Sequence, residues 1–116
     1  MTLAWGKTTL DCVDPERAAR FWSALLELPI RPHHDGWFDV GPATTGGPAL
    51  NFQPVPAPTP GKTRVHLDIW VDDLQASIAR VEALGGRFVS DIFSGLGAIM
   101  ADTEGTEFCL LAGSPL

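Results

Sequence analysis

Apolar and polar residues alternate in two short segments that lie half a chain length apart, and a helical pattern follows each of them. The first segment ends at Val13-Asp14 and the second at Val71-Asp72, in a chain of 116 residues. Alternation with a period of two predicts a strand with one buried face, and an aspartate at the strand's end suits a helix N-cap. A repeat of this size predicts two copies of one unit, related by a pseudo-twofold axis.

Each predicted helix has a start signal and an apolar stripe. In the first copy, Asp14 is expected to be the N-cap, with Pro15 at the first helical position. In the second copy, Asp72 is expected to be the N-cap, and Gly85-Gly86 is expected to end the helix in the left-handed conformation. The apolar stripes are Ala18, Phe21, Trp22, Leu25 and Leu26 in the first helix, and Leu74, Ile78, Val81 and Leu84 in the second.

Short strands are predicted after each helix, so both copies are predicted to have the order β-α-β-β-β. The strands are 37–41 and 49–53 in the first copy, and 87–90, 97–101 and 106–111 in the second. One strand of the first copy is only weakly indicated. Turns are expected at 44–48 and 102–105.

We interpret the chain as a single domain over residues 1–116, with one module at 1–54 and another at 62–116. Residues 54–61 contain four prolines and are expected to form an extended linker without helix or strand.

The charge balance argues against two classes of partner. Eight basic and fourteen acidic side chains give a net charge of −6, and an acidic surface repels nucleic acids and anionic membranes. The sequence has no apolar run long enough for a transmembrane helix, and residues 1–9 lack the pattern of a signal peptide. Two cysteines are too few for a disulfide scaffold, so a cytoplasmic location is expected.

Three segments, taken in their order and spacing, carry a resemblance to a known family. They are LDCVDPERAARFW at 10–22, KTRVHLDIWVDDL at 62–74 and ADTEGTEFCLL at 101–111. The chain resembles the vicinal oxygen chelate superfamily, which includes glyoxalase I, bleomycin-resistance proteins and extradiol dioxygenases, and within it the glyoxalase-like domain group. The resemblance implies an α+β fold, in which two tandem βαβββ modules form a cupped, half-open, barrel-like mixed sheet around a pocket, with the helices outside. A homodimer is expected from the resemblance and from the open edges of so small a sheet.

In metal-dependent members of the superfamily, the inner strands supply four ligands, usually His and Glu, to a divalent metal. Carried over position by position, these places fall on His66 and Cys109 in the second copy, and on Lys7 or Thr8 together with Gln53, or else Asn51, in the first. A lysine ammonium has no lone pair to give, and the set lacks the carboxylates that Mg²⁺ and Mn²⁺ prefer. We therefore expect no cofactor; if a divalent metal is bound, the expected ligands are His66, Gln53 and Cys109.

One face of the second repeat's first strand carries three chemically useful side chains. Alternation places His66, Asp68 and Trp70 on one face, which we expect to line the pocket, and the apolar residues between them on the helix side. A histidine suits proton transfer near neutral pH, so His66 and Asp68 are the candidate catalytic residues. The alternative is structural, with His66 hydrogen-bonded inside the strand and Asp68 paired with Arg64.

The tryptophans supply the other part of the pocket prediction. Trp22 lies on the helical stripe and is expected in the core, whereas Trp5, Trp37 and Trp70 are candidates to line a pocket for a flat or apolar ligand. Packing in the core or in a dimer interface is the alternative for these three. The predicted ligand-binding set is Trp5, Lys7, Trp37, Gln53, Trp70 and Cys109.

Other reactive side chains are expected to contribute less. Cys12 and Cys109 lie in apolar strands, where a cysteine usually acts as a small buried apolar residue. His33 and His34 follow two prolines and are expected to be exposed, with one of them at the rim of the pocket.

Three functions remain open on these observations. The first is a metal-free small-molecule-binding protein with a tryptophan-lined pocket. The second is a metal-dependent enzyme of the glyoxalase or dioxygenase type, and the third is a metal-free isomerase or lyase that uses His66.

Overall fold

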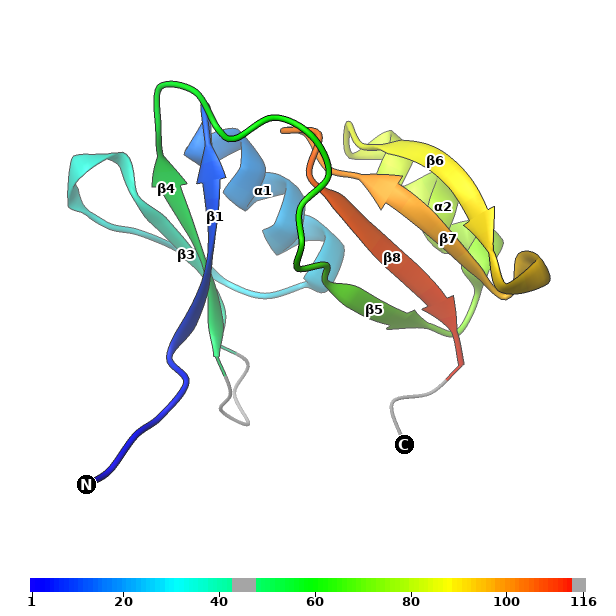
Figure 1. The fold of residues 1–116 in the computed structure, drawn as a ribbon, viewed down its shortest axis with the longest axis horizontal. Helices are drawn as coiled ribbons and strands as arrows, with labels where there is room; N and C mark the ends of the chain where they lie inside the picture. Colours follow the sequence, from blue (N-terminus) through cyan, green and yellow to red (C-terminus); the bar gives the residue numbers. More distant parts are fainter. Residues whose placement is uncertain (43–47, 114–116) are drawn as a thin grey trace. The chain divides into compact units, whose positions relative to one another are not determined.

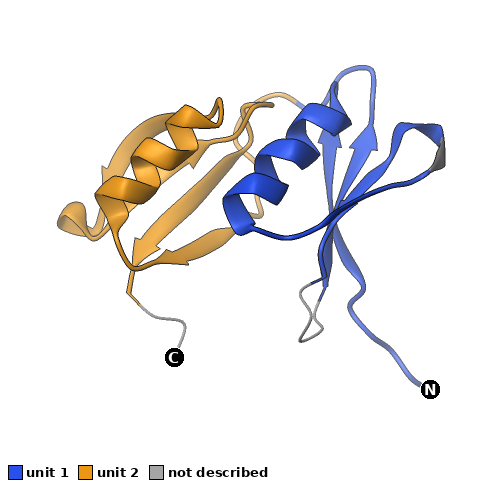
Figure 2. Cartoon of the chain, turned by 180° about the vertical axis from the view of Figure 1, so that it is seen from behind, with its two compact units in different colours: residues 1–59 blue, residues 60–116 orange. Residues whose placement is uncertain are grey.

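The computed structural model describes residues 1–42 and 48–113, and the chain divides into two compact units, residues 1–59 and 60–116 (Figure 2). Each unit has the predicted order β-α-β-β-β and one four-stranded mixed sheet, so the α+β prediction is confirmed (Figure 1). Of the two expected turns, the one at 44–48 lies almost entirely outside the described residues. The division falls in the proline-rich segment, which has neither helix nor strand between residues 55 and 67.

Unit 1 builds its sheet in the strand order β1-β4-β3-β2. Its elements are β1 (Lys7–Cys12), α1 (Pro15–Leu26), β2 (Ile30–Pro32), the 3-10 turn η1 (His34–Gly36), β3 (Phe38–Val40) and β4 (Ala49–Pro54). β1 runs parallel to β4, and the other neighbours are antiparallel. The first strand is therefore bonded to the last strand of the same unit, 42 residues further along at the Thr9–Asn51 pair.

The start of α1 follows the sequence prediction. The side chain of Asp14 accepts a hydrogen bond from the backbone N–H of Arg17 at 3.2 Å, and Pro15 begins the helix. The buried face of α1 includes Ala18, Phe21 and Trp22, which confirms that Trp22 belongs to the core.

Unit 2 repeats this topology in the strand order β5-β8-β7-β6. Its elements are β5 (Asp68–Val71), α2 (Leu74–Ala83), β6 (Arg87–Ile92), the 3-10 turn η2 (Phe93–Gly95), β7 (Gly97–Ala101) and β8 (Glu107–Ala112). β5 is parallel to β8, and the pairs β6–β7 and β7–β8 are antiparallel. The expected turn at 102–105 connects β7 to β8, where Asp102 accepts hydrogen bonds from the backbone N–H groups of Glu104 and Thr106 at 2.9 Å.

The N-cap of α2 differs from the prediction by one residue. Asp73, and not Asp72, accepts a hydrogen bond from the backbone N–H of Ala76 at 3.0 Å. β5 continues through Val71, so the chain needs one more residue before it can turn into the helix. The helix ends at Ala83 and is followed, as expected, by a left-handed glycine, Gly85, whose φ is 102°; the N–H of Gly86 bonds to the carbonyl of Val81.

One strand was not predicted. β2 is only three residues long, contains Pro32 and begins directly after Pro29, so its sequence reads as a helix stop and not as a strand. It lies at the edge of the sheet and has a neighbouring strand on one side only. A proline, which has no N–H to donate, is tolerated in such a strand.

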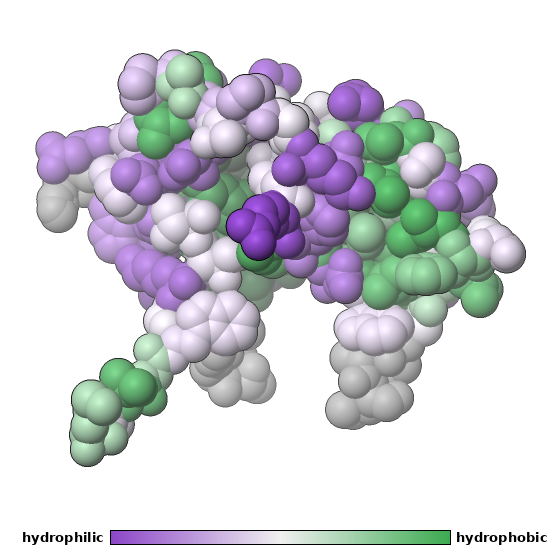
Figure 3. All heavy atoms as spheres, viewed as in Figure 1, coloured by the Kyte–Doolittle hydropathy of each residue, from purple (hydrophilic) through white to green (hydrophobic). Residues whose placement is uncertain are grey.

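In each unit the helix packs on one face of the sheet and leaves the other face open. Figure 2 shows α1 and α2 in front of their sheets, and Figure 1 shows the opposite faces. Figure 3 shows hydrophobic side chains gathered over β6, β7 and β8, whereas the visible surface of unit 1 is mainly hydrophilic or neutral. In the described part of the chain, neither helix has the length and apolar character needed to cross a bilayer.

Candidate functional site

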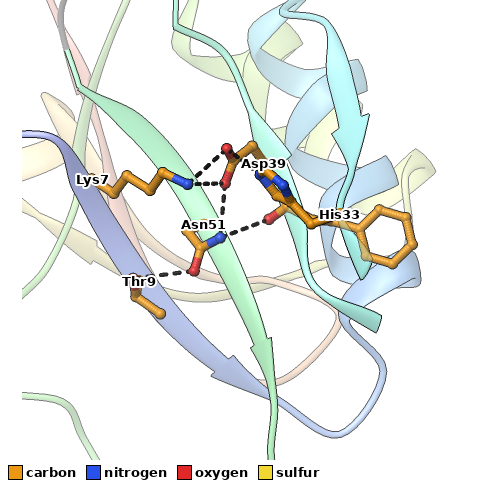
Figure 4. Close-up of polar contacts among 6 residues, drawn as sticks. Lys7, Thr9, His33, Asp39 and Asn51 are labelled. Carbon is orange, nitrogen blue, oxygen red and sulfur yellow. Dashed lines mark hydrogen bonds and ion pairs between the residues drawn. The ribbon is translucent and has the colours of Figure 1, made fainter. Parts of the chain in front are cut away.

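The open face of the unit 1 sheet carries a row of polar side chains that strand register brings side by side. Thr9 on β1 is paired with Asn51 on β4, and Asn51 is paired with Asp39 on β3. Their chain neighbours Phe52 and Val40 are fully buried, so alternation turns the polar residues to the face opposite α1. Figure 4 shows these residues with Lys7 from the start of β1 and His33 from the connection between β2 and β3.

Asp39 is the centre of this network. Its Oδ2 lies 2.9 Å from Lys7 Nζ and 2.7 Å from His33 Nε2, and its Oδ1 accepts hydrogen bonds from Lys7 Nζ at 3.2 Å and from Asn51 Nδ2 at 2.7 Å. Asn51 in turn accepts a hydrogen bond from the Thr9 hydroxyl at 3.3 Å. Three donors therefore share the two oxygens of one carboxylate, which fixes the side chains of three strands and one loop (Figure 4).

These contacts keep Asp39 ionised although it is only 8% exposed. Burial by itself raises the pKa of a carboxyl group, because it disfavours the charged form. The hydrogen bonds from His33, Asn51 and Lys7, together with the charge of Lys7, outweigh this effect and lower the pKa of Asp39 from 3.8 to about 2. The network therefore contains a permanent ion pair at neutral pH.

A pocket of about 380 Å³ opens beside the network. It is lined by Lys7, Thr9, His33, Asp35, Trp37 and Asn51, all of which belong to unit 1. Lys7 and His33 keep 46% and 41% of their side-chain surface exposed, so they can reach a ligand while they hold Asp39. Trp37 is half-buried and adds a flat aromatic wall to an otherwise polar lining.

The donor chemistry does not fit a divalent metal. Lys7 is bound to Asp39 and is a cation itself, Asn51 already uses its oxygen and its nitrogen, and Asp39 is saturated by other donors. Within neither unit do three His, Cys, Asp or Glu side chains of the described residues come together as a metal site requires.

The second repeat brings together part of the set predicted for it. Asp68 on β5 is directly paired with Cys109 on β8, and Asp68 and Trp70 are exposed while Ile69 and Val71 are half-buried, as the alternation predicts. His66 is also exposed but precedes β5, and it contacts no described residue through a hydrogen bond or an ion pair. Its role and that of Asp68 in catalysis stay predictions.

Cys109 is held in its protonated form. Partial burial, followed by the negative charge of Asp68 beside it, raises the pKa of the Cys109 thiol. A thiolate is the form that binds metals and attacks electrophiles, so this environment suits an inert residue. In the described residues, Arg64 and Asp68 form no ion pair; Asp68 faces Cys109 instead.

The other predicted ligand-binding residues are spread over unit 1 and unit 2. Lys7 and Trp37 line the pocket of unit 1. Trp5 is exposed ahead of β1 and donates its indole N–H to the backbone carbonyl of Lys7 at 3.1 Å. Trp70, in unit 2, is exposed and its ring lies against Gly113. Gln53 is half-buried and paired with Asp11 at the far end of β1.

Strand register also decides which residue of the first copy corresponds to Cys109. Cys109 is paired with Asp68, which lies five residues before the N-cap Asp73, and Asn51 is paired with Thr9, which lies five residues before the N-cap Asp14. Asn51, which the sequence offered as the alternative, is therefore the counterpart of Cys109, and Gln53 is not.

Sequence reasoning missed the residue at the centre of the site. Asp39 was read only as part of a short strand, although a charged residue between Phe38 and Val40 in an apolar segment is a signal of a buried, paired group. The sequence predicts that either His33 or His34 lies at the pocket rim. The structure places His33 in the pocket lining, where it bonds to Asp39.

Comparisons with known proteins agree with this architecture. The sequence model of the family described as "Glyoxalase-like domain" matches residues 7–111. No curated protein sequence matches the chain. The solved structures that are similar in fold include a hypothetical protein from S. aureus, the antibiotic binding protein TnmS3 from Streptomyces sp. CB03234, and glyoxalase I from Leishmania major.

These similarities extend over nearly whole chains at low sequence identity. The S. aureus protein has a TM-score of 0.73 and 19% identity, with 97% of this chain and 99% of that chain covered. TnmS3 has a TM-score of 0.68 and 22% identity, with coverage of 97% and 98%. The Leishmania enzyme has a TM-score of 0.68 and 20% identity, with coverage of 96% and 87%. The family match and the repeated βαβββ order together show that the chain belongs to the glyoxalase-like domain family of the vicinal oxygen chelate superfamily.

Proposed function

We propose that this protein binds a small organic molecule in the pocket of unit 1 and needs no metal to do so. The observation that carries the proposal is a pocket of about 380 Å³ lined by the aromatic Trp37 together with polar side chains that are fixed by hydrogen bonds. Pockets for small ligands commonly combine an aromatic surface, which supplies affinity, with a few placed polar groups, which supply orientation.

The polar groups are held in position before any ligand arrives. Lys7, His33 and Asn51 are each bonded to Asp39, so their side chains lose little conformational freedom when a ligand binds. Ordering flexible side chains is one of the main costs of binding, and a site that is already ordered avoids much of it.

The residues at the superfamily's ligand positions support the metal-free form of this proposal. Lys7 and Asn51 are poor metal ligands and are engaged with Asp39, and the raised pKa of Cys109 disfavours the thiolate that zinc would need. The structural neighbour TnmS3, described as an antibiotic binding protein, supports a binding role for a protein of this fold.

Two alternatives remain open to experiment. A metal-dependent enzyme of the glyoxalase I kind would show activity only after Zn²⁺ or Mn²⁺ is added. A metal-free proton-transfer enzyme was expected from the sequence to use His66 and Asp68. The contact of 2.7 Å between His33 and Asp39 favours a second place for that chemistry, because a carboxylate fixes the orientation of an imidazole ring.

The proposal is tested with indole, a neutral flat probe, by following backbone amide shifts of the labelled protein during a titration. We expect the shifts to gather at the pocket residues and the affinity to fall about tenfold or more in Trp37→Ala, since an aromatic wall is lost. Trp70→Ala, which removes an exposed tryptophan in unit 2, serves as the matched control and should bind indole normally. Binding that survives Trp37→Ala but is lost in Trp70→Ala would contradict the proposal.

We also propose that the protein forms a homodimer, which follows from the family and from the exposed apolar side chains of unit 2. Sedimentation at several concentrations tests this, and a mass of 12.4 kDa at all of them would contradict it.

A further inference from the structure

We propose that the pocket of unit 1 selects flat ligands that carry a positive charge, such as aromatic amines, and that Asp35 is the residue that selects them. This inference rests on the proposed binding function of the same pocket and adds the class of ligand. It follows from which charges in the pocket are already paired and which one is not.

The charges of Lys7 and Asp39 cancel. Lys7 Nζ contacts both oxygens of Asp39, at 2.9 and 3.2 Å, so one positive and one negative charge compensate each other. Asn51 and Thr9 add hydrogen bonds but no charge. This part of the lining therefore orients a ligand through dipoles and has no strong preference for the sign of its charge.

Asp35 is the charge that remains. It lines the pocket and is exposed, and across the described ranges 1–42 and 48–113 it forms neither an ion pair nor a hydrogen bond through its side chain. With Lys7 paired to Asp39, the carboxylate of Asp35 is the acidic charge of the lining that no described cation compensates. A cation is attracted to this carboxylate, and an anion that approached Lys7 would meet both Asp39 and Asp35.

The turn that carries Asp35 also carries the aromatic wall. The backbone N–H of His33 bonds to the carbonyl of Trp37 at 2.8 Å and closes the turn, with Asp35 and Gly36 at its tip in left-handed conformations, φ of 61° and 79°. Asp35 and Trp37 therefore reach the pocket from one closed turn. A carboxylate beside an indole ring is a suitable arrangement for an organic ammonium, because the ring face attracts cations as well.

The net charge of the whole chain acts in the same direction. A value of −6 raises the local concentration of cationic ligands and lowers that of anionic ones. This long-range effect is independent of Asp35, and a variant that removes one distant carboxylate measures it separately.

The test compares tryptamine with indole-3-acetate, which share one ring and differ in the sign of their charge. The labelled full-length protein is titrated with each at pH 8, where the amine of tryptamine is positively charged and the carboxylate of indole-3-acetate is negatively charged. We expect tryptamine to bind about fivefold more tightly than indole-3-acetate, as measured from the shifts of the pocket amides. In Asp35→Asn, this preference should fall to about twofold or less.

The variants are chosen to keep the fold intact. Asparagine tolerates the left-handed conformation of residue 35, so Asp35→Asn removes the charge without straining the turn. Asp11→Asn is the matched control, because Asp11 is an exposed carboxylate of the same unit that does not line the pocket. It should keep the preference for tryptamine nearly unchanged.

The outcomes separate this inference from the proposed function. If indole binds at the pocket but tryptamine and indole-3-acetate bind equally, or if Asp35→Asn and Asp11→Asn have the same effect, the inference is wrong and the binding function stands. If none of the three probes shifts the pocket amides, both are overturned.

Discussion

At the scale of single residues, Asp39 explains why the polar network exists. A carboxylate that is 8% exposed would be costly to bury alone, and Asn51 beside it is only 3% exposed. Each supplies the other with a hydrogen-bond partner, and Lys7 and His33 complete the set from the more exposed side. The pocket therefore has a rigid floor because a buried charge requires one.

The lowered pKa of Asp39 makes stability depend on pH in a defined direction. The ionised carboxylate stabilises the folded state fully above its unfolded pKa of 3.8, and this contribution is lost as the pH falls toward about 2. A lowering of this size corresponds to about 2 kcal/mol. We expect Asp39→Asn to be less stable than the native protein by about 1–3 kcal/mol at pH 6, and the gap to shrink at pH 3, as urea unfolding at both pH values would measure.

Asp11→Asn provides the comparison for this measurement. Asp11 is an exposed residue of β1 and forms no ion pair with another described residue. Its replacement should therefore change the free energy of unfolding by less than about 0.5 kcal/mol. A gap between native protein and Asp39→Asn that is the same at pH 6 and pH 3 would show that Asp39 is not ionised through the network.

At the scale of elements, the sequence predicts the repeat and its helices well, because these depend on local signals. As predicted, Asp14 caps α1, Pro15 begins it, and Gly85 takes a left-handed conformation after α2. The N-cap of α2 is ambiguous in the sequence, since Asp72 and Asp73 are adjacent and only the end of β5 decides between them. β2 is missed because Pro32 within it and Pro29 directly before it are typical of a helix stop and not of a strand.

The two adjacent aspartates allow a sharp test of helix capping. Asp73→Ala removes the side chain that accepts from the N–H of Ala76, so we expect the free energy of unfolding to fall by about 1 kcal/mol. Asp72→Ala removes an equal charge from the neighbouring exposed residue and should have little effect. The account of this helix is wrong if urea denaturation shows the larger loss in Asp72→Ala.

The candidate site could be predicted only in part, for a physical reason at the same scale. Alternation tells which face Lys7 occupies but not which strand lies beside it. Asp39 meets Lys7 and Asn51 across separations of 32 and 12 residues, and these contacts depend on the order β1-β4-β3-β2. The sequence therefore led to Lys7 and Trp37, but it did not reveal Asp39, the carboxylate that joins Lys7, His33 and Asn51 in one network.

At the scale of the whole molecule, the two copies keep one fold and differ in chemistry. Unit 1 has an ion-pair network on the open face of its sheet (Figure 4). The equivalent face of unit 2 has Asp68 beside a protonated Cys109. Equivalent strands thus carry different side chains at equivalent positions, as Asn51 and Cys109 do. Because of this difference, we assign ligand binding to unit 1 alone and propose that it needs no metal.

The most direct test of that claim is a map of indole binding on the full chain after treatment with EDTA, repeated with Zn²⁺ added. We predict that the backbone amide shifts gather at Lys7, His33, Trp37 and Asn51 and that the affinity is the same in both samples. Binding that appears only when Zn²⁺ is present, with shifts centred on His66 and Cys109, would contradict the account.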